Sequence, residues 1–439
     1  MAAEKSKGVR GGIPGHRIDP ERFLADFEEL AAIGATPDGG VDRPAFSEAH
    51  LEARLWLLNQ AVKAGLPTRV DAAGNHIVFV QTGPEAKPRS LLLGSHLDSV
   101  PRGGRFDGAL GVAAGLEILR TIKERAIALP FDLELYDFTD EEGHFVGLMG
   151  SQALAGLLKP AQLQTPGQER SLFHDALERS GIAPGTILDT AKDPTTLAGY
   201  VELHIEQGLH LAEAEADLGV VTAIVGIRSF RLHFIGRADH AGTTPLDKRF
   251  DAGLGASAFH LAAHQHVARN HPDCVVTVGD MGFSPGAFNV VPKTAAVALE
   301  FRAETDDELD ALEAEILNIA AEQAGVFGLA LEIDRLERAA PVQMDSGFQK
   351  TIARVSEALG LKCLSLASGA GHDAQSLAQV CPAGMIFIPS TGGFSHSPRE
   401  SSEWNHCVQG ANALLHTVLA LAEDVVNTAV ETGIKGKQP

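Results

Sequence analysis

The stretch LYDFTDEEG, residues 135–143, begins as a short apolar segment and ends in three adjacent acids before a glycine. With Leu133 before it, its first part is typical of a buried strand in a parallel sheet, because the run is short and largely apolar. Asp140, Glu141 and Glu142 follow where such a strand would end. Neighbouring carboxylates repel one another and lose hydration when buried. The acids therefore indicate either a cation site or a fully solvated turn, and ligands bind at this end of strands in open α/β sheets.

Strands and helices alternate on both sides of this stretch. We expect strands at Ile77–Val80, Leu91–Leu93, Asp132–Phe138, Tyr200–Ile205 and Met385–Ile388, and helices at 47–64, 109–123, 348–359 and 404–426. Asp19, Pro20 and Glu21 are typical of the cap of a helix that follows them. This alternation predicts a doubly wound α/β fold with a mixed sheet.

The pattern changes between about residues 219 and 333. Four expected strands and two amphipathic helices there predict a separate α+β layer of ferredoxin-like type. The α/β pattern resumes near Pro341. We therefore expect one domain, residues 18–216 and 334–428, to be interrupted by an inserted domain of residues 217–333. Residues 1–17 and 429–439 are expected to be flexible ends.

The composition narrows the possible partners and compartment. The chain has 439 residues and a formal net charge of −21, which argues against nucleic acid and anionic membranes because both attract basic surfaces. No window is long and apolar enough to predict a membrane span. The amino terminus lacks the apolar run of a signal peptide. The four cysteines have no CxxC spacing, so we expect reduced thiols and a cytoplasmic protein.

Histidines and carboxylates gather where the expected strands end. The members of this set are His96, Asp98, Asp107, Glu141, Glu142, His204 and His396. Imidazoles mixed with carboxylates suit Zn²⁺, Mn²⁺, Co²⁺ or Ni²⁺ better than Ca²⁺ or Mg²⁺. Taken singly, each has a plainer interpretation: Asp107 as part of a glycine-rich turn, or a histidine as a hydrogen-bonded structural residue. His372 and Asp373 are either a catalytic pair or, as we favour, the start of a helix.

Seven segments in this order resemble a known family. They are GSHLD (94–98), GRFDG (104–108), DEEG (140–143), HIEQG (204–208), DHAGTTP (239–245), NVVP (289–292) and SGAGHD (368–373). Over about residues 20–425 the chain resembles the amidohydrolases related to the M20 metallopeptidases. It is most similar to the carbamoylase branch, which comprises N-carbamoyl-L-amino-acid hydrolase, β-ureidopropionase and allantoate amidohydrolase.

The resemblance implies a site for two divalent metal ions, Zn, Mn, Co or Ni, in each subunit. His96 and His204 would hold one ion, and Glu142 and His396 the other. Asp107 would bridge the two. Asp98 would orient His96 through its other ring nitrogen. Glu141 would be the general base, taking a proton from the attacking water and passing it to the leaving nitrogen.

The resemblance also implies a homodimer in which the inserted domain is a dimerisation or lid domain. His240 of the partner subunit would stabilise the oxyanion that forms at the substrate carbonyl. Asn289 and Arg302 would hold a free carboxylate on a small-molecule substrate, Arg302 as a fork matched to two oxygens. Gln207 and the backbone of Gly369 and Ala370 would complete the pocket.

The expected reaction is hydrolysis of N-carbamoyl-L-amino acids or related ureido acids to amino acid, CO₂ and ammonia. One feature departs from the branch: the loop after Gly143 is shorter and lacks an Arg-Phe pair, so the exact substrate stays open. Hydrolysis of N-acyl amino acids, including aryl-acyl conjugates, is the alternative. A binding or scaffold protein without activity would be expected to have lost Glu141 or an expected ligand, and all are present.

Overall fold

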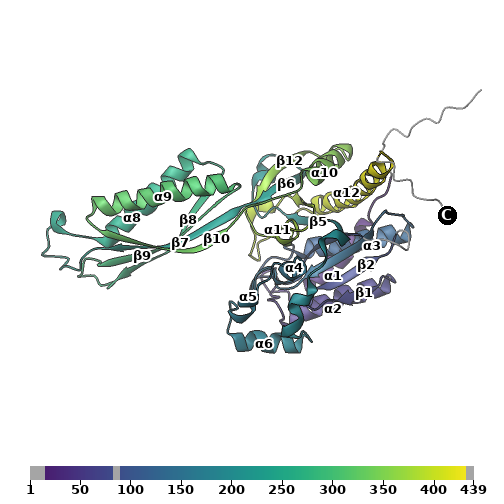
Figure 1. Ribbon diagram of the computed structural model, residues 1–439, viewed down its shortest axis with the longest axis horizontal. Helices are drawn as coiled ribbons and strands as arrows, with labels where there is room; N and C mark the ends of the chain where they lie inside the picture. Colours follow the sequence, from purple (N-terminus) through teal and green to yellow (C-terminus); the bar gives the residue numbers. More distant parts are fainter. Residues whose placement is uncertain (1–14, 83–88, 432–439) are drawn as a thin grey trace, which may run out of the picture. The chain divides into compact units, whose positions relative to one another are not determined.

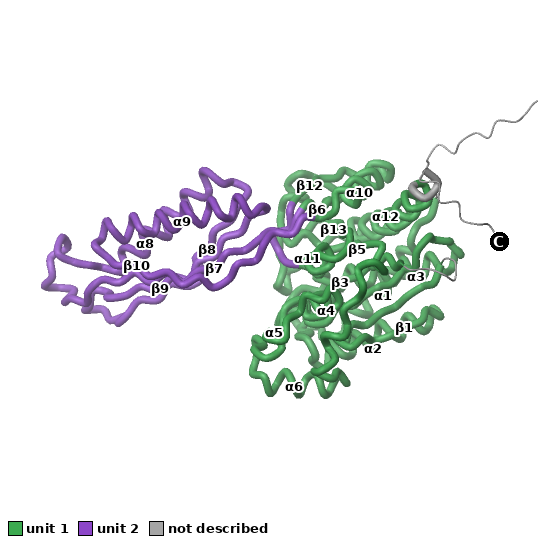
Figure 2. Tube along the Cα trace, in the orientation of Figure 1, with its two compact units in different colours: residues 1–222, 344–366, 372–439 green, residues 223–343, 367–371 purple. Residues whose placement is uncertain are grey.

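The computed structural model describes residues 15–82 and 89–431 and divides the chain into two compact units. Figure 2 shows them in two colours. Unit 1 comprises Met1–Thr222, Met344–Leu366 and His372–Pro439, and unit 2 comprises Ala223–Gln343 and Ala367–Gly371. Residues 1–14 and 432–439, which make up most of the expected flexible ends, lie outside the described residues.

The larger sheet is mixed, with parallel strands at its centre. Its order is β1-β2-β4-β3-β5-β13-β6-β11, and β12 also pairs with β6. The bounds are β1 Thr68–Val70, β2 His76–Val80, β3 Ser90–His96, β4 Asp132–Phe138, β5 Leu197–Ile205, β6 Leu218–Ile224, β11 Val342–Gln343, β12 Cys363–Ser368 and β13 Ala383–Ile388. The pairs β4–β3, β3–β5 and β5–β13 are parallel. The expected α/β fold with a mixed sheet is confirmed.

Helices cover both faces of this sheet. One face packs against α1 Pro20–Ala32, α2 Glu48–Lys63, α3 Ala109–Glu124, α10 Ser346–Ala358 and α12 Trp404–Glu431, whose apolar side chains share one core with alternate residues of the central strands. The other carries α4 Met149–Leu154 and α11 Asp373–Leu377. As expected, Asp19 caps α1 by accepting from two backbone N–H groups of its first turn. The shorter elements of this unit are α5 Pro160–Gln164, α6 Arg170–Arg179, α7 His210–Glu213 and the 3₁₀ turns η1 Pro184–Thr190, η2 Pro194–Thr196 and η4 Thr391–Gly393.

The second sheet has four antiparallel strands in the order β10-β7-β9-β8. They are β7 Gly226–Ile235, β8 Val275–Ser284, β9 Thr294–Ala303 and β10 Ala330–Ala339, and η3 Leu246–Lys248 follows β7. Two helices, α8 Ala252–Asn270 and α9 Asp306–Val326, pack side by side on one face (Figure 1). Alternate residues of β7 and β9 are buried beneath them, as period-two patterning requires. This is the expected inserted α+β layer.

The parallel strands β3, β4 and β5 all end at the same edge of the larger sheet. His96 is the last residue of β3, and His204 is the penultimate residue of β5. The acidic turn follows the end of β4 directly. The sheet therefore gathers at one edge side chains that lie far apart in the chain. Among the described residues, no helix is long and apolar enough to cross a membrane.

Candidate metal and catalytic site

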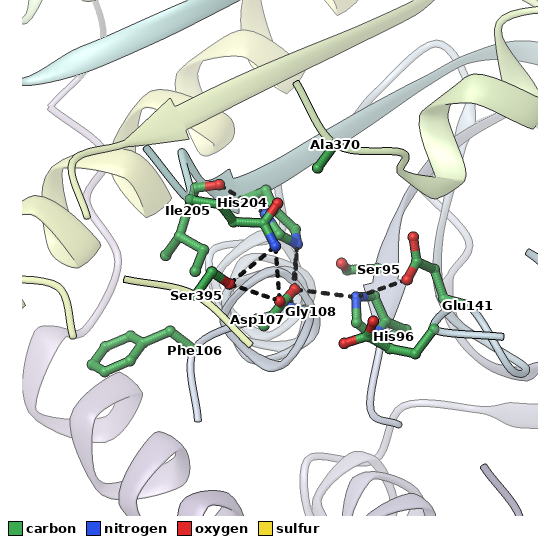
Figure 3. Close-up of polar contacts among 12 residues, drawn as sticks. Ser95, His96, Phe106, Asp107, Gly108, Glu141, His204, Ile205, Ala370 and Ser395 are labelled. Atoms are coloured by element: carbon green, nitrogen blue, oxygen red, sulfur yellow. Dashed lines mark hydrogen bonds and ion pairs between the residues drawn. The ribbon is translucent and has the colours of Figure 1, made fainter. Parts of the chain in front are cut away.

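Asp107 lies at the centre of the polar cluster, in the loop between β3 and α3. Its Oδ1 is 3.1 Å from Nε2 of His204 and 3.5 Å from Nε2 of His96. Figure 3 shows both imidazoles turned toward this carboxylate, and all three side chains are buried. The next residue, Gly108, has φ +65°, and a Cβ there would lie 2.5 Å from the His96 ring. Only glycine fits where the loop passes this imidazole.

The other oxygen of Asp107 faces a second group. Its Oδ2 lies 3.4 Å from Nε2 of His396, and the same imidazole nitrogen lies 3.5 Å from Oε2 of Glu142. The His396 side chain is 52% exposed, whereas those of Glu142 and Asp107 are 7% and 5% exposed. His396 has a positive φ of 50°, as do Asp140 at 54° and Gln207 at 61°. Such backbone costs about 1–3 kcal/mol at each non-glycine residue and is concentrated at functional sites.

The orientation of the two buried imidazoles favours a positive charge between them and Asp107. Nδ1 of His96 is 3.0 Å from the backbone carbonyl of Asp98, and Nδ1 of His204 is 2.8 Å from that of Ile205. A carbonyl oxygen only accepts, so each Nδ1 carries a proton. In the neutral rings both Nε2 lone pairs then point at the carboxylate of Asp107. Either protons or a metal ion must separate these acceptors, and nitrogen with carboxylate oxygen is a donor set that a first-row divalent ion prefers.

The crowded carboxylates of the cluster also favour bound positive charge. Although burial opposes ionisation, hydrogen bonds from the protonated rings of His204, His396 and His96 hold the pKa of Asp107 well below its usual range when no metal ion is bound. Burial, together with the charge of Asp107, raises the pKa of Glu142 to about 7. Burial also raises the pKa of the neighbouring Asp140 to about 8. A site that crowds this many carboxylates is stabilised by bound positive charge.

Glu141 lies beside this cluster. Its Oε2 is 3.6 Å from Nε2 of His96, and the side chain is 9% exposed. It belongs to neither of the two groups of potential ligands that share Asp107, which are His96, Asp107 and His204, and Asp107, Glu142 and His396. Burial raises the pKa of Glu141 well above its usual value, against the opposing charge of His96. A buried carboxyl group next to, but outside, the ligand groups is placed to accept and return a proton.

Asp98 acts through different atoms from those expected. The expected contact joined its carboxylate to Nδ1 of His96, but those atoms are 3.8 Å apart, and the backbone carbonyl of Asp98 holds Nδ1 instead. The carboxylate accepts from the backbone N–H of Glu141 at 3.3 Å and of Glu142 at 3.1 Å. Asp98 therefore orients His96 and the acidic turn together. Strand pattern alone does not predict this, because it does not say which oxygen faces the ring.

Glu400 is a buried residue of the site that the sequence analysis missed. Its Oε1 accepts from the backbone N–H of Phe106 at 2.8 Å and of Asp107 at 3.0 Å. Its Oε2 accepts from the hydroxyl of Ser395 at 2.8 Å. Gln207, expected in the substrate pocket, donates to Oδ2 of Asp107 at 2.9 Å and to Ser395 at 3.1 Å. The only sequence signal for Glu400 is its position four residues after His396.

His372, which the sequence analysis placed at the start of a helix, is also a neighbour of the site, since its ring centroid lies 4.4 Å from that of His204. It is also the residue just before α11, and Asp373 begins that helix, so the helix-start interpretation is confirmed. Glu202, on β5, completes a further group with His204 and His372 whose ligand atoms lie within 4.8 Å of one another. It accepts from Ser95, Tyr200 and the backbone of Ala374.

Five expected substrate or catalytic residues belong to unit 2. They are His240, Asn289, Arg302, Gly369 and Ala370. His240 and Asn289 are exposed. Nδ1 of His240 accepts from the backbone N–H of Gly242 at 3.0 Å and of Thr243 at 3.2 Å. Arg302 donates to Glu300 at 2.8 Å and to the backbone carbonyl of Gly369 at 2.7 Å.

Comparison with known proteins decides the family. The model of peptidase family M20/M25/M40 matches residues 92–420. The chain belongs to this family. It is 37% identical over 412 residues to an N-carbamoyl-L-amino acid amidohydrolase of Geobacillus stearothermophilus, covering 92% of this chain and 99% of that protein. It is 32% identical to the allantoate amidohydrolase of Bacillus subtilis, with the same coverage of both chains.

A crystal structure shows the same likeness in three dimensions. The amidase of the hydantoinase/carbamoylase family from Burkholderia phymatum superimposes with a TM-score of 0.83 at 35% identity, covering 93% of this chain and 99% of that one. The M20 protein is therefore a hydrolase acting on amide bonds, and its family is metal-dependent. The clusters around Asp107 are its candidate ligand groups.

Proposed function

We propose that this protein hydrolyses the C–N bond of N-carbamoyl-L-amino acids or closely related ureido acids, releasing the amino acid, CO₂ and ammonia. The observation that carries the proposal is the placement of Asp107, whose two carboxylate oxygens face two separate histidine-containing groups beside Glu141. The printed activities of the Geobacillus and Bacillus relatives support a ureido acid as the substrate class.

The ligand groups suit two divalent ions of the Zn, Mn, Co or Ni type. His96 and His204 would hold one ion, Glu142 and His396 would hold the other, and Asp107 would offer one oxygen to each. When bound, such ions polarise the substrate carbonyl and make the attacking water more acidic. Support comes from the Nε2 lone pairs of His96 and His204, which in the neutral rings face a carboxylate that a bound metal ion would separate from them.

Glu141 is the proposed general base. It takes a proton from the attacking water and later delivers it to the leaving nitrogen, so the carboxyl group ends the cycle as it began. Its buried position raises its pKa well above its usual value, which favours a carboxyl group that takes up and returns a proton. Asp98 keeps it in place, because the Asp98 carboxylate accepts the Glu141 backbone N–H.

His240 is the proposed oxyanion donor, contributed by the partner in a homodimer. Its Nδ1 accepts from two backbone N–H groups, which leaves the proton of the neutral ring on Nε2. That nitrogen is therefore a donor, as a developing oxyanion requires. Asn289 and Arg302 would bind the free carboxylate of the substrate, and Gln207 with the backbone of Gly369 and Ala370 would line the pocket.

Product analysis tests this function. The purified protein, loaded in turn with Zn²⁺, Mn²⁺, Co²⁺ or Ni²⁺, is incubated with matched N-carbamoyl-, N-formyl- and N-acyl-L-amino acids. We expect one ammonia for each amino acid released from the carbamoyl compound. Release of a carboxylic acid from the acyl compounds, with no ammonia from any ureido acid, would overturn the proposal in favour of an N-acyl amino acid hydrolase.

A further inference from the structure

A second group of imidazoles and a carboxylate lies on unit 2. Nε2 of His266 is 2.6 Å from Oε2 of Glu315, and Nε2 of His271 is 2.7 Å from the same oxygen. The three potential ligand atoms lie within 4.8 Å of one another. Neither the substrate contacts nor the proton transfers proposed above use any of these residues.

Two packed helices hold these side chains in position. His266 lies in the last part of α8, and Glu315 lies in the middle of α9, which packs beside α8. His271 directly follows the last residue of α8, and its backbone N–H donates to the carbonyl of Val267 at 2.8 Å. Its own carbonyl accepts from the backbone N–H of Cys274 at 3.0 Å. Because the helices share a packed core, the three ligands need little ordering before they bind an ion.

The hydrogen-bonded arrangement leaves one acceptor shared by two donors. Both imidazole nitrogens meet a single carboxylate oxygen, which requires a proton on each Nε2. The side chains of His266, His271 and Glu315 are 29%, 18% and 42% exposed, so an ion can reach them from solvent. A metal ion can take the place of the shared protons, because both ring nitrogens and the carboxylate oxygen are potential ligands.

We propose that His266, His271 and Glu315 form a binding site for a divalent first-row transition metal ion, best matched by Zn²⁺. Two imidazoles and one carboxylate are a common zinc ligand set, with a fourth position left for water. The ion would tie the end of α8 to α9 within unit 2. The site is separate from the candidate catalytic cluster, so it does not depend on the proposed function.

The surroundings can adjust to an ion. Zinc–nitrogen and zinc–oxygen bonds are about 2.0–2.2 Å long, so the ligand atoms must move apart by a fraction of an ångström to about one ångström. The flexible, partly exposed side chain of Glu315 permits this movement. Asn270 lies 3.0 Å from Nδ1 of His266 through its side-chain amide. Turning that amide would present its oxygen to an Nδ1–H and free Nε2 for the ion.

Metal counting on the full-length protein tests the site. Metal-free protein is equilibrated with buffered Zn²⁺, and bound zinc is measured for wild type and for His266→Gln/His271→Gln. We expect the double variant to bind one equivalent fewer per chain, whatever the number bound at the catalytic cluster. The matched control, His260→Gln/His264→Gln, removes two exposed histidines from the same helix and should bind as wild type does.

Glu315→Gln supplies an independent variant that keeps the size of the side chain. Loss of a partner at a metal site costs at least about 10–100-fold in affinity, so zinc binding at this equivalent should weaken by that factor. Unchanged circular dichroism would show that the variants are folded. Equal zinc contents in wild type and the double variant would overturn the site. Loss of the equivalent in the control pair would also overturn it, since the ion would then lie elsewhere on α8.

Discussion

Replacing Glu400 separates its two roles near Asp107, which are to accept backbone hydrogen bonds and to place a negative charge there. Glu400→Ala removes both oxygens, whereas Glu400→Gln keeps an oxygen that can accept the backbone N–H groups of Phe106 and Asp107. The loop packs closely against this carboxylate, since a Cβ on Gly104 would overlap the Glu400 carboxylate. The difference between the two variants therefore measures how much the acceptor at this position stabilises the Asp107 loop.

The hydrogen bonds set the expected magnitude. Glu400 is 4% exposed, so its removal leaves two buried N–H groups without a partner, each costing about 1–3 kcal/mol. Glu400→Ala should therefore lower the free energy of unfolding of unit 1 by about 2–6 kcal/mol. Glu400→Gln loses the charge of the acceptor but also removes a buried negative charge beside Asp107. Burial and Asp107 raise the pKa of Glu400, so we expect Gln to cost only about 1–2 kcal/mol.

Tryptophan fluorescence during urea unfolding of the metal-free protein measures these differences. The two tryptophans, Trp56 and Trp404, both belong to unit 1, so the signal reports that unit alone. Trp404 packs 5.8 Å from Phe27, which in turn packs 4.8 Å from Phe106. Metal affinity should fall about 10–100-fold in the Ala variant and by less in the Gln variant. The reasoning fails if Ala costs under about 1 kcal/mol or if Gln is no better than Ala.

Three further predictions follow from the site and its surroundings. Glu141→Gln should lower kcat by about 10²–10⁴-fold and leave the metal content unchanged, as turnover and metal analysis would show; substantial residual turnover contradicts the assigned base. His240→Ala and Glu141→Ala should each be inactive alone, whereas mixed dimers should regain activity; no recovery would exclude a donor from the partner subunit. Burial and Arg54 lower the pKa of His76 to about 3. In the unfolded chain His76 binds a proton near pH 6.5, whereas in the folded chain it does so only near pH 3. The free energy of unfolding therefore falls as pH falls from about 6.5 toward 3. Between about pH 7 and pH 4 this loss is about 3 kcal/mol, and His76→Gln should remove it in urea unfolding measured at both values.

Local pattern predicted the framework of the site well. The short apolar runs before His96, Glu141 and His204 were readable as strands, because parallel strands buried on both faces are nearly continuous in hydrophobicity. Parallel strands end at one edge, so their terminal polar residues were expected to meet there. The inserted α+β layer could also be predicted from the sequence, because alternating strands and long amphipathic helices have different hydrophobic periods.

The sequence by itself determined which residue types stand at the ends of the strands, since burial and period are local properties. Only the tertiary structure decided which oxygen of Asp98 holds His96 and which oxygen of Asp107 faces each histidine group. It alone brought Glu400 to the Asp107 loop, nearly three hundred residues away in the chain, and Glu315 to the end of α8. The physical reason is that a contact between distant segments depends on how helices and loops pack, and no local periodicity records that packing.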